Sequence, residues 1–560
     1  MTTDSERCKS CNQRQEDLTK KYKVTRNEVI SKIRCEEIEA VIQAIIKSGS
    51  PSEYWRTVKE ITSCKDCGQV LILEEKREVI SDPKMVATVM NFFFKDKIEG
   101  IEKEIPNLNI NPTEKLEESL KDKNLNFSLK TVTERQVEKA IKAMKNKSNS
   151  GIDFISPKLV KMAVDVIKGP LCIIINASIS EGEFPDSWKI GKITPIWKKK
   201  GSKRDKTMYR PVSLLRSASK VLEIVVNQQV LRFFEENHLL PKSQYGFRSK
   251  RSTFSAVAAM HETWLNNKVK KGQTQAVTFF DLSAAFDALS RDIFCSKIKL
   301  YGFDEKSISW FRSYLTNRQQ VVMIEDVISD PVTINVGSPQ GAILSPTIFI
   351  ILISDIGLYS DSTIFGYADD TTSTVSGTDI PMLVAKCEEE AKKIIDYMSI
   401  NRLKTIDDKT HVMVIHKSQT EEKLTFTIGK ETITESESEK LLSIHVSNNL
   451  RWEQHLSPLL PKLRHRLFTL RRIMGKLPNH LLKRVADGIF MSQVRYGLPL
   501  YCPVKMKEED PTPGCIDKLT VAFNDCLRLI TGNTRQDHTS IKNMLEELDW
   551  LSLYQLGENN

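Results

Sequence analysis

The sequence has no apolar stretch long enough to cross a membrane. Its longest apolar runs, such as Ile348–Ile353, fall well short of the roughly 20 residues that a transmembrane helix needs. The N-terminal sequence MTTDSERCKSC also lacks the apolar core of a signal peptide. We therefore expect a soluble, non-secreted protein of the nucleus or the cytoplasm, with no membrane partner.

Cysteine is too sparse and too scattered for a disulfide framework, because the 560 residues contain 11 cysteines without regular spacing. Two Cys-x-x-Cys pairs, Cys8 with Cys11 and Cys64 with Cys67, hold the four thiolates that a tetrahedral zinc site requires. The gap between the pairs is far longer than in a zinc ribbon, and no His follows at finger spacing. Unpaired cysteines are the default interpretation, and a structural zinc is the open alternative.

Neither sign of charge dominates the composition, because 82 Lys and Arg residues stand against 72 Asp and Glu residues, a net charge of +10. The positive charge is nevertheless concentrated in two stretches. Residues 188–210 contain nine basic residues and one acid, and residues 461–484 contain eight basic residues and no acid. Such density favours binding to a polyanion such as a nucleic acid. The alternative is two solvated surface segments.

The pattern along the chain indicates several successive parts. Residues 1–105 are charged and mostly helical in pattern, with an amphipathic stretch from Pro83 to Ile98, and residues 106–126 form a polar linker. The capping pattern Thr133-x-x-Gln136 predicts a helix start. From Ile190 to about Lys417 the pattern indicates mixed α and β structure, and beyond Trp452 it is largely helical. The strands are expected at four β-branched runs, 193–197, 276–280, 320–324 and 411–415.

Acidic residues follow apolar segments at two places. The apolar strand predicted at 276–280 ends at Asp281, so this carboxylate is expected to project into a cleft from a strand end. The string Phe365-Gly-Tyr367-Ala-Asp369-Asp370 lies between strand-like segments and predicts a β-hairpin with two acids at its turn. Asp281, Asp369 and Asp370 are therefore candidates to meet across one sheet.

Three carboxylates at such a place are able to bind two hard cations through oxygen, which suits Mg²⁺. Two cations would neutralise the repulsion between adjacent acids, activate an attacking hydroxyl and hold the leaving phosphates. Phosphoryl transfer on nucleotides is the natural reaction for this arrangement. The ordinary alternative is a solvated loop, because paired acids are common in a chain with 72 of them.

Taken in order, the motifs resemble those of the reverse transcriptases of non-LTR retrotransposons, most closely the jockey-like group. The matching strings before Asp281 are Lys147–Asp153, Phe184–Trp188, Ile193–Lys199, Tyr209–Leu214, and Gln244–Arg248 with Ser252-Thr253. They are followed by the string around Asp281, then Gly337-Ser-Pro-Gln340-Gly341-Ala-Ile-Leu-Ser-Pro346, and finally Tyr367-Ala-Asp369-Asp370. Residues 403–409 and 442–452 resemble the family's closing palm motif and the start of its thumb. The resemblance covers residues 53 to 556.

The resemblance implies roles for individual residues. Asp281, Asp369 and Asp370 would ligate two Mg²⁺ ions, with Mn²⁺ as a substitute, and the backbone carbonyl of Leu282 would be a further ligand. Phe286 would lie under the incoming sugar, where its ring would clash with a 2′-hydroxyl and favour deoxynucleotides. The alternative for Phe286 is a place in the core.

Further residues are implied around the incoming nucleotide. Gln340 and Gly341 would lie beside it, where Gly lets the backbone approach closely. Lys198 and Arg210 would bind the triphosphate, Arg through its bidentate fork, unless they are surface charges. Lys409 would supply a proton to the departing pyrophosphate.

The implied fold is α+β: a right-hand polymerase with fingers, an antiparallel-sheet palm and a helical thumb, extended by helical N- and C-terminal parts. The implied function is an RNA-directed DNA polymerase that extends a DNA primer on an RNA template with dNTPs. Residues 188–210 and 461–484 would contact the nucleic acid. The expected parts are a helical lead-in segment (1–105), a linker and N-terminal extension (106–185), fingers and palm (186–435), a thumb (436–500) and a C-terminal helical region (501–560).

The chain also departs from the family. Phe154 stands where members often have Gly. The chain begins about where the family's upstream endonuclease domain would have ended, so cleavage of a DNA target is not expected of it. Two other functions stay open: a catalytically inactive remnant that only binds RNA, and an RNA-templated RNA polymerase, against which Phe286 argues.

Overall fold

The computed structural model describes residues 71–558 apart from 76–77, 107, 272, 284–285, 416–421, 476 and 503–513, together with Lys32, Glu36, Glu39, Ala40 and Gln43. The chain divides into two compact units, one spanning Gln69–Arg451 and the other including Trp452–Asn560. The four cysteines of the zinc hypothesis and most of the expected lead-in segment lie outside the described residues.

A mixed sheet forms around the strand predicted at 193–197. Its strand order is β4 (Tyr209–Leu214), β3 (Ile190–Trp197), β7 (Arg318–Ile324) and β8 (Val327–Ile328), with β9 (Val332–Ile334) also paired to β7. β3 and β7 run parallel, and the other pairs are antiparallel. Helix α3 (Pro83–Glu104), predicted from the amphipathic stretch, packs on this sheet because Phe94 shares a buried cluster with Ile193 and Val322.

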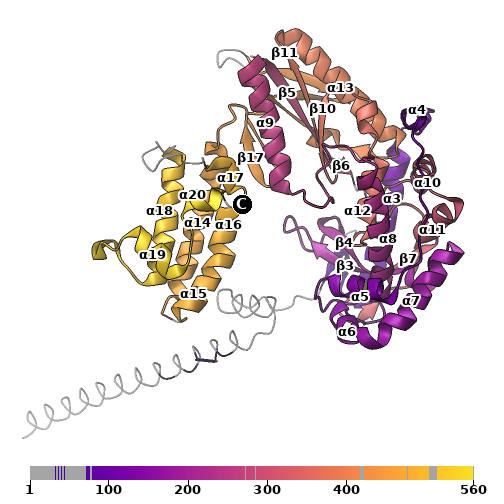
Figure 1. Cartoon of the computed structure of the whole chain (residues 1–560), viewed down its shortest axis with the longest axis horizontal. Coiled ribbons are helices and arrows are strands. Elements are labelled where there is room, and N and C mark those ends of the chain that lie inside the picture. The colour runs from indigo at the N-terminus through magenta and orange to yellow at the C-terminus, as the bar shows by residue number, and fades with distance from the viewer. Residues whose placement is uncertain are drawn as a thin grey trace, which may run out of the picture. The chain divides into compact units, whose positions relative to one another are not determined.

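A second, antiparallel sheet contains the predicted acid-bearing hairpin. Its strand order is β10 (Thr363–Tyr367), β11 (Asp370–Gly377), β5 (Thr274–Phe280) and β13 (His411–Ile415). Helices α9 (Thr253–Lys271) and α13 (Ile380–Ile400) lie along it (Figure 1). Trp264 of α9 donates to Thr374 Oγ1 at 3.0 Å, whereas Cys387 Sγ of α13 lies 3.3 Å from Thr278 Oγ1. Because Thr374 pairs with Val277 and side chains alternate along a strand, the two helices cover opposite faces.

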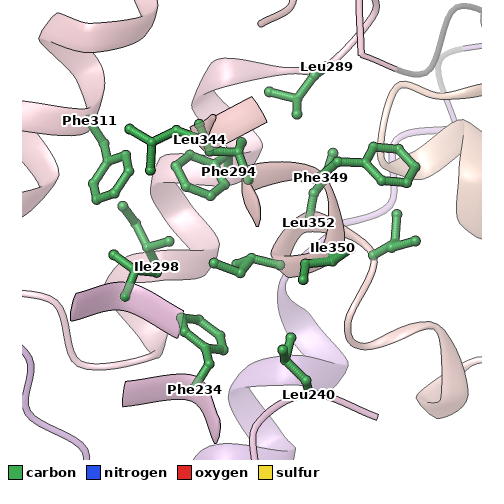
Figure 2. Packing of buried hydrophobic residues seen from close by; sticks show 14 of the residues in the cluster. Phe234, Leu240, Leu289, Phe294, Ile298, Phe311, Leu344, Phe349, Ile350 and Leu352 are labelled. Carbon is green, nitrogen blue, oxygen red and sulfur yellow. The ribbon is translucent and has the colours of Figure 1, made fainter. Parts of the chain in front are cut away.

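A helical layer shares one buried cluster with the second sheet. It contains α8 (Ser217–Glu236), α10 (Arg291–Leu300), α11 (Glu305–Leu315) and α12 (Leu344–Leu352). Helix α12 is apolar on nearly all sides, which is typical of a fully buried helix, and Figure 2 shows Phe349 and Ile350 packed among side chains of the neighbouring segments. The fully buried ion pair between Lys297 Nζ and Asp355, 2.6 Å apart, ties α10 to the segment after α12.

The remaining segments of this unit are mostly short, apart from the 18-residue helix α7. They are β1 (Leu73–Glu75), β2 (Glu78–Ile80), α4 (Glu114–Leu120), α5 (Glu134–Ala143), α6 (Pro157–Met162), α7 (Val164–Glu181), β6 (Leu282–Ser283), β12 (Lys404–Thr405), β14 (Thr425–Ile428), β15 (Glu431–Thr434), β16 (Ser438–Leu441) and β17 (Ile444–Ser447). The predicted capping box at Thr133 is confirmed. Within 106–126, expected to be a polar linker, α4 forms and buries Leu116.

Phe154 has a φ of +57°. This left-handed conformation is strained for a residue with a side chain, whereas Gly adopts it freely. The backbone therefore explains why Gly suits this position in the family that the chain resembles.

The second unit is helical throughout its described residues. It contains α14 (Glu453–Ile473), α15 (Asn479–Ala486), α16 (Ser492–Arg495), α17 (Leu498–Tyr501), α18 (Gly514–Thr531), α19 (Ile541–Leu548) and α20 (Leu553–Glu558), with a π-helical turn at Asp487–Met491. Leucines of α14 and α18 meet in one buried cluster. No described helix in either unit combines the length and apolar character that a bilayer span requires.

The range expected for a helical thumb, 436–500, opens with the hairpin of β16 and β17 instead of a helix. Its turn residues, Leu442 and Ser443, both have positive φ, +48° and +69°. Two-residue hairpin turns of this kind usually contain Asn or Gly, so the sequence carried no ordinary turn signal. Leu441 and Ile444 beside the turn are buried, and this burial favours the hairpin.

Candidate functional site

The acids singled out from the sequence lie at one end of the antiparallel sheet. The register pairs Phe280 of β5 with Thr371 of β11, so the next residues, Asp281 and Asp370, follow on neighbouring strands. Asp370 in turn pairs with Tyr367 across the β10–β11 hairpin. Asp369 is in the two-residue turn between these strands. The backbone thus places three carboxylates from two distant segments beside one another.

A loop from another part of the chain supports the acidic turn. Tyr245 N–H donates to Gly366 O at 2.7 Å, and Gly366 N–H donates to Ser243 O at 3.0 Å. A Cβ at Gly246 would lie 2.2 Å from Ala368 N, which is too close for any real pair of atoms. The absence of a side chain at Gly246 therefore permits the close approach that fixes the turn, in which Ala368 has a φ of +58°.

Electrostatic repulsion is visible at two of the acids. Burial raises the pKa of Asp370 to about 6, with further contributions from the charges of Asp369 and Asp281. Burial and the charge of Asp281 also raise the pKa of Asp369, against the effect of a backbone hydrogen bond. Carboxylates held in this way gain from a nearby cation.

Lys409 supplies one such cation. Its Nζ donates to Asp281 Oδ2 at 3.1 Å, and both side chains are substantially exposed. Within the described part of the chain, no three His, Cys, Asp or Glu side chains are grouped closely enough to hold a metal ion. A metal ion held by all three acids would therefore need their side chains in positions other than those described.

The sheet of β3 and β4 carries further positive charge at Lys198 and Arg210. Burial lowers the pKa of Lys198, and the charges of Lys97, Arg210, Lys200 and Lys409 add to the effect. Lys198 Nζ donates to Thr207 O at 2.7 Å, while Arg210 is exposed on β4 beside Ile196. These mutually repelling cations suit a polyanionic ligand such as a triphosphate.

The expected nucleotide-site residues lie close to the acids in the fold. Phe286 is half-buried and packs with Phe349 of α12 at a ring-centroid distance of 5.3 Å and with Phe247 at 6.1 Å. Leu282 is buried on β6. Ile406 N–H donates to Asp281 O. Successive carbonyls of a strand point to opposite sides in an antiparallel ladder, so the carbonyl of Leu282 points away from β12.

The segment 337–341 is held from several sides. Ser213 N–H donates to Gln340 O at 3.0 Å, and the Gln340 side chain donates to Asp287. Gly341 has a φ of +103°, and a Cβ there would lie 2.7 Å from Ser213 O. Burial raises the pKa of Asp287 to about 7. Glycine is therefore required at position 341, both because of the positive φ and because a side chain would clash with β4.

Four residues near the site were missed by sequence reasoning. They are Lys97, Gly246, Phe247 and Asp287. Gly246 and Phe247 lie inside a motif string quoted for the resemblance, and Asp287 follows Phe286 directly, so position within a motif was an available signal. Lys97 is on α3, far away in the sequence, and only the packing of α3 on β7 brings it near.

Comparison with known proteins identifies this part of the chain. Residues 197–446 match the family model described as reverse transcriptase (RNA-dependent DNA polymerase). This part of the chain, less than half of its 560 residues, is similar to reverse transcriptases. The match includes Asp281, the acidic hairpin, Gln340 and Lys409, and it confirms the resemblance to reverse transcriptases.

Named relatives agree with this family. The chain is 28% identical over 279 residues to the probable RNA-directed DNA polymerase from transposon BS of Drosophila melanogaster, which covers 49% of this chain and 30% of that protein. It is 28% identical over 255 residues to the RNA-directed DNA polymerase from mobile element jockey of the same species, covering 44% and 28%. The jockey protein of Drosophila funebris is 24% identical over 388 residues, covering 66% and 42%. The chain thus spans less than half the length of these relatives.

The acids at this end of the antiparallel sheet have the chemistry to bind a divalent cation. All three offer carboxylate oxygens, the donors that Mg²⁺ and Mn²⁺ prefer. Burial and the neighbouring acids raise the pKa values of Asp369 and Asp370, so a nearby cation would stabilise their charged forms. Asp281, Asp369 and Asp370 are therefore the residues that would hold the metal.

Proposed function

We propose that the protein is an RNA-directed DNA polymerase that extends a DNA primer on an RNA template. The observation that supports this most strongly is the placement of Asp281 at the end of β5 next to Asp370 of β11. This arrangement offers carboxylates to two cations at the edge of a sheet, as phosphoryl transfer to a primer hydroxyl requires.

Asp281, Asp369 and Asp370 would hold two Mg²⁺ ions, for which Mn²⁺ can substitute, together with the carbonyl of Leu282. When bound, the metals lower the pKa of the primer 3′-hydroxyl and stabilise the charge on the leaving phosphates. The residues themselves orient the reacting groups. The carboxylates define where the primer terminus and the α-phosphate meet, and the hairpin turn fixed by Gly246 keeps that place constant.

Lys409 has two successive roles in this proposal. In the metal-free protein it neutralises Asp281 through the ion pair at 3.1 Å. With metal ions neutralising Asp281, the Lys409 ammonium would be available to face the leaving pyrophosphate and give it a proton. Its position directly before β13, beside the end of β5, is consistent with both roles.

The nucleotide would lie between the two sheets of the first unit. Lys198 and Arg210 would bind the triphosphate, and Gln340 with Gly341 would contact the nucleotide from the segment before α12. Phe286, held between Phe247 and Phe349, would exclude a ribose 2′-hydroxyl. Because its ring is held in place, Phe286 would discriminate between dNTPs and rNTPs, whereas a loosely held ring would move aside for the 2′-hydroxyl.

In this proposal the first unit supplies the fingers, from the sheet of β3, β4 and β7, and the palm, from the sheet of β5, β10, β11 and β13. Helices of the second unit would act as the thumb and C-terminal region. The basic stretches 188–210 and 461–484 would contact phosphates of the RNA template and the DNA primer. Such phosphate contacts carry no sequence preference.

Primer extension tests the proposal. Purified protein with Mg²⁺, an RNA template, an annealed DNA primer and dNTPs is expected to extend the primer. The double variant Asp369→Ala, Asp370→Ala is expected to show only background. A matched control is Asp122→Ala, which removes an exposed acid of the same unit without a hydrogen bond or ion pair among the described residues.

The control variant is expected to extend primers like the wild type. Equal, background-level extension by wild type and double variant, combined with retained RNA binding, would favour the inactive RNA-binding remnant. Efficient incorporation of rNTPs in place of dNTPs would favour an RNA polymerase instead.

A further inference from the structure

We propose that Glu223 on α8 is a positioning residue for the nucleotide site, acting through the start of α12 on the segment 337–341. The inference rests on the proposed polymerase function. Glu223 is fully buried and belongs to none of the motifs that carry the resemblance. It lies 120 residues before Ile343, the residue to which it is hydrogen-bonded.

Helix α12 lacks a cap from its own sequence. Its N-cap residue is Ile343, and no side chain of the N-cap accepts a hydrogen bond. The first N–H groups of a helix need acceptors when they are buried. Glu223 Oε2 accepts from Ile343 N–H at 2.6 Å, so α8 supplies the acceptor that α12 does not have.

The Glu223 carboxylate is itself held in place. Its Oε1 accepts from Ser219 Oγ, one turn earlier on α8, at 2.9 Å. A negative charge at a helix N-terminus is favourable because the helix dipole is positive there. The nearby guanidinium of Arg318 also attracts it, while burial raises its pKa. The position of the carboxylate is thus set by α8 and not by solvent.

The start of α12 is linked to the nucleotide segment by short-range bonds. Ser345 Oγ donates to Pro339 O at 2.9 Å, and Ser345 Oγ lies 2.5 Å from Ser338 Oγ. Gln340 O accepts from Ser213 N–H, and Gly341 lies so close to β4 that a Cβ there would be 2.7 Å from Ser213 O. A shift of the start of α12 must therefore displace Gln340 and Gly341.

The same helix also supports Phe286 through Phe349. Loss of the Glu223 carboxylate leaves a buried N–H without an acceptor, which the structure can relieve only by moving α12 or admitting water. Both the nucleotide segment and the ring beneath the sugar would then be misplaced. We expect this to weaken dNTP use more than it weakens primer binding.

A matched control is present one turn further along α8. Asn227 Oδ1 accepts from Thr347 Oγ1 at 2.5 Å, so it joins the same two helices without contacting the start of α12. Asn227→Ala is expected to lower the melting temperature while leaving the KM for dNTP unchanged. This variant therefore distinguishes a general loss of packing between α8 and α12 from a specific displacement of the segment 337–341.

The test measures primer extension against dNTP concentration for wild type, Glu223→Ala, Glu223→Gln and Asn227→Ala. Glu223→Ala is expected to raise the KM for dNTP about tenfold, since small displacements of the groups that hold a substrate are costly. Glu223→Gln retains an oxygen that accepts an N–H, so an intermediate value is expected. A KM within twofold of wild type in folded Glu223→Ala protein, or an equal rise in Asn227→Ala, would overturn the inference.

Hydrogen–deuterium exchange of residues 337–345 provides a readout that does not depend on activity. Faster exchange in Glu223→Gln but not in Asn227→Ala supports the positioning role, and unchanged exchange in both contradicts it. Absence of primer extension by the wild type would refute the proposed function, while the exchange result would still decide whether Glu223 holds this segment.

Discussion

Asp370 shows the effect of placing acids together at the scale of one residue. Its pKa is raised to about 6, whereas an unfolded chain has an Asp pKa of about 3.9. Between these values the folded state binds more protons than the unfolded state, so the metal-free protein loses stability as pH rises through this window. Above pH 6 the loss is complete and constant.

Asp370→Asn is therefore expected to stabilise the metal-free protein at neutral pH, because the amide cannot ionise. Melting temperatures in the presence of a chelator should show a difference from wild type that grows from pH 4.5 to pH 6 and then stays level. Mg²⁺ should raise the melting temperature of wild type at pH 7.5 and should do so less for the variant. A difference that does not change with pH would contradict the electrostatic account.

The sequence predicted that Asp281, Asp369 and Asp370 would meet, because each follows a recognisable strand or turn, and the register places Asp281 and Asp370 on neighbouring strands. It could not indicate the ion pair between Lys409 and Asp281, since side-chain partners 128 residues apart are set by strand order. Glu223 could not be predicted either. A single Glu within a helical pattern gives no sign that it caps another helix.

At the scale of elements, the β10–β11 hairpin depends on the loop that contains Gly246. Gly246→Ala would bring a Cβ to 2.2 Å from Ala368 N, so either the loop or the acidic turn must move. We expect primer-extension activity to fall about a hundredfold or more, because misplacement by about 1 Å is that costly. Single-turnover rates measure the effect.

Gly357→Ala is the control for this change, since a Cβ at Gly357 meets nothing within 4 Å. Its activity should match the wild type. Wild-type activity in Gly246→Ala would show that the turn tolerates displacement, and the assignment of Gly246 as its support would be wrong.

Strand patterns were the most predictable part of the fold. The runs 193–197, 276–280, 320–324 and 411–415 all lie in strands, because β-branched residues in apolar runs leave few alternatives. The β16–β17 hairpin was missed because its turn, Leu442-Ser443, adopts positive φ without Gly or Asn. Burial of the flanking side chains decided the conformation there, and burial is not visible in a local pattern.

At the scale of the whole molecule, the second unit presents a basic helix. Lys462, Arg464, Arg466, Arg471 and Arg472 of α14 are exposed, and the structure records no ion pair for them within its described residues. Phe468 is exposed on the same helix. Unpaired cations of this density suit phosphate binding, as the sequence predicted for 461–484.

Replacing Arg464, Arg471 and Arg472 with Gln is expected to weaken binding to a primer–template duplex of any sequence. The slope of log affinity against log salt should decrease by roughly 0.9 for each phosphate that the variant no longer neutralises. Fluorescence anisotropy at several salt concentrations measures both quantities. Arg535→Gln is the control, because Arg535 in the same unit is already paired with Asp525 at 3.0 Å. If the slope of log affinity against log salt is unchanged in the triple variant, the duplex does not bind these three arginines.

The central claim is that three carboxylates from two distant segments act together on divalent cations at a primer terminus. The most direct measurement is the single-turnover rate of primer extension by Asp281→Asn, which keeps the side-chain shape and removes the charge. We predict a rate at least about a thousandfold below wild type, the size expected when a key electrostatic group is lost, at an unchanged fold. Extension within tenfold of the wild-type rate would contradict the account.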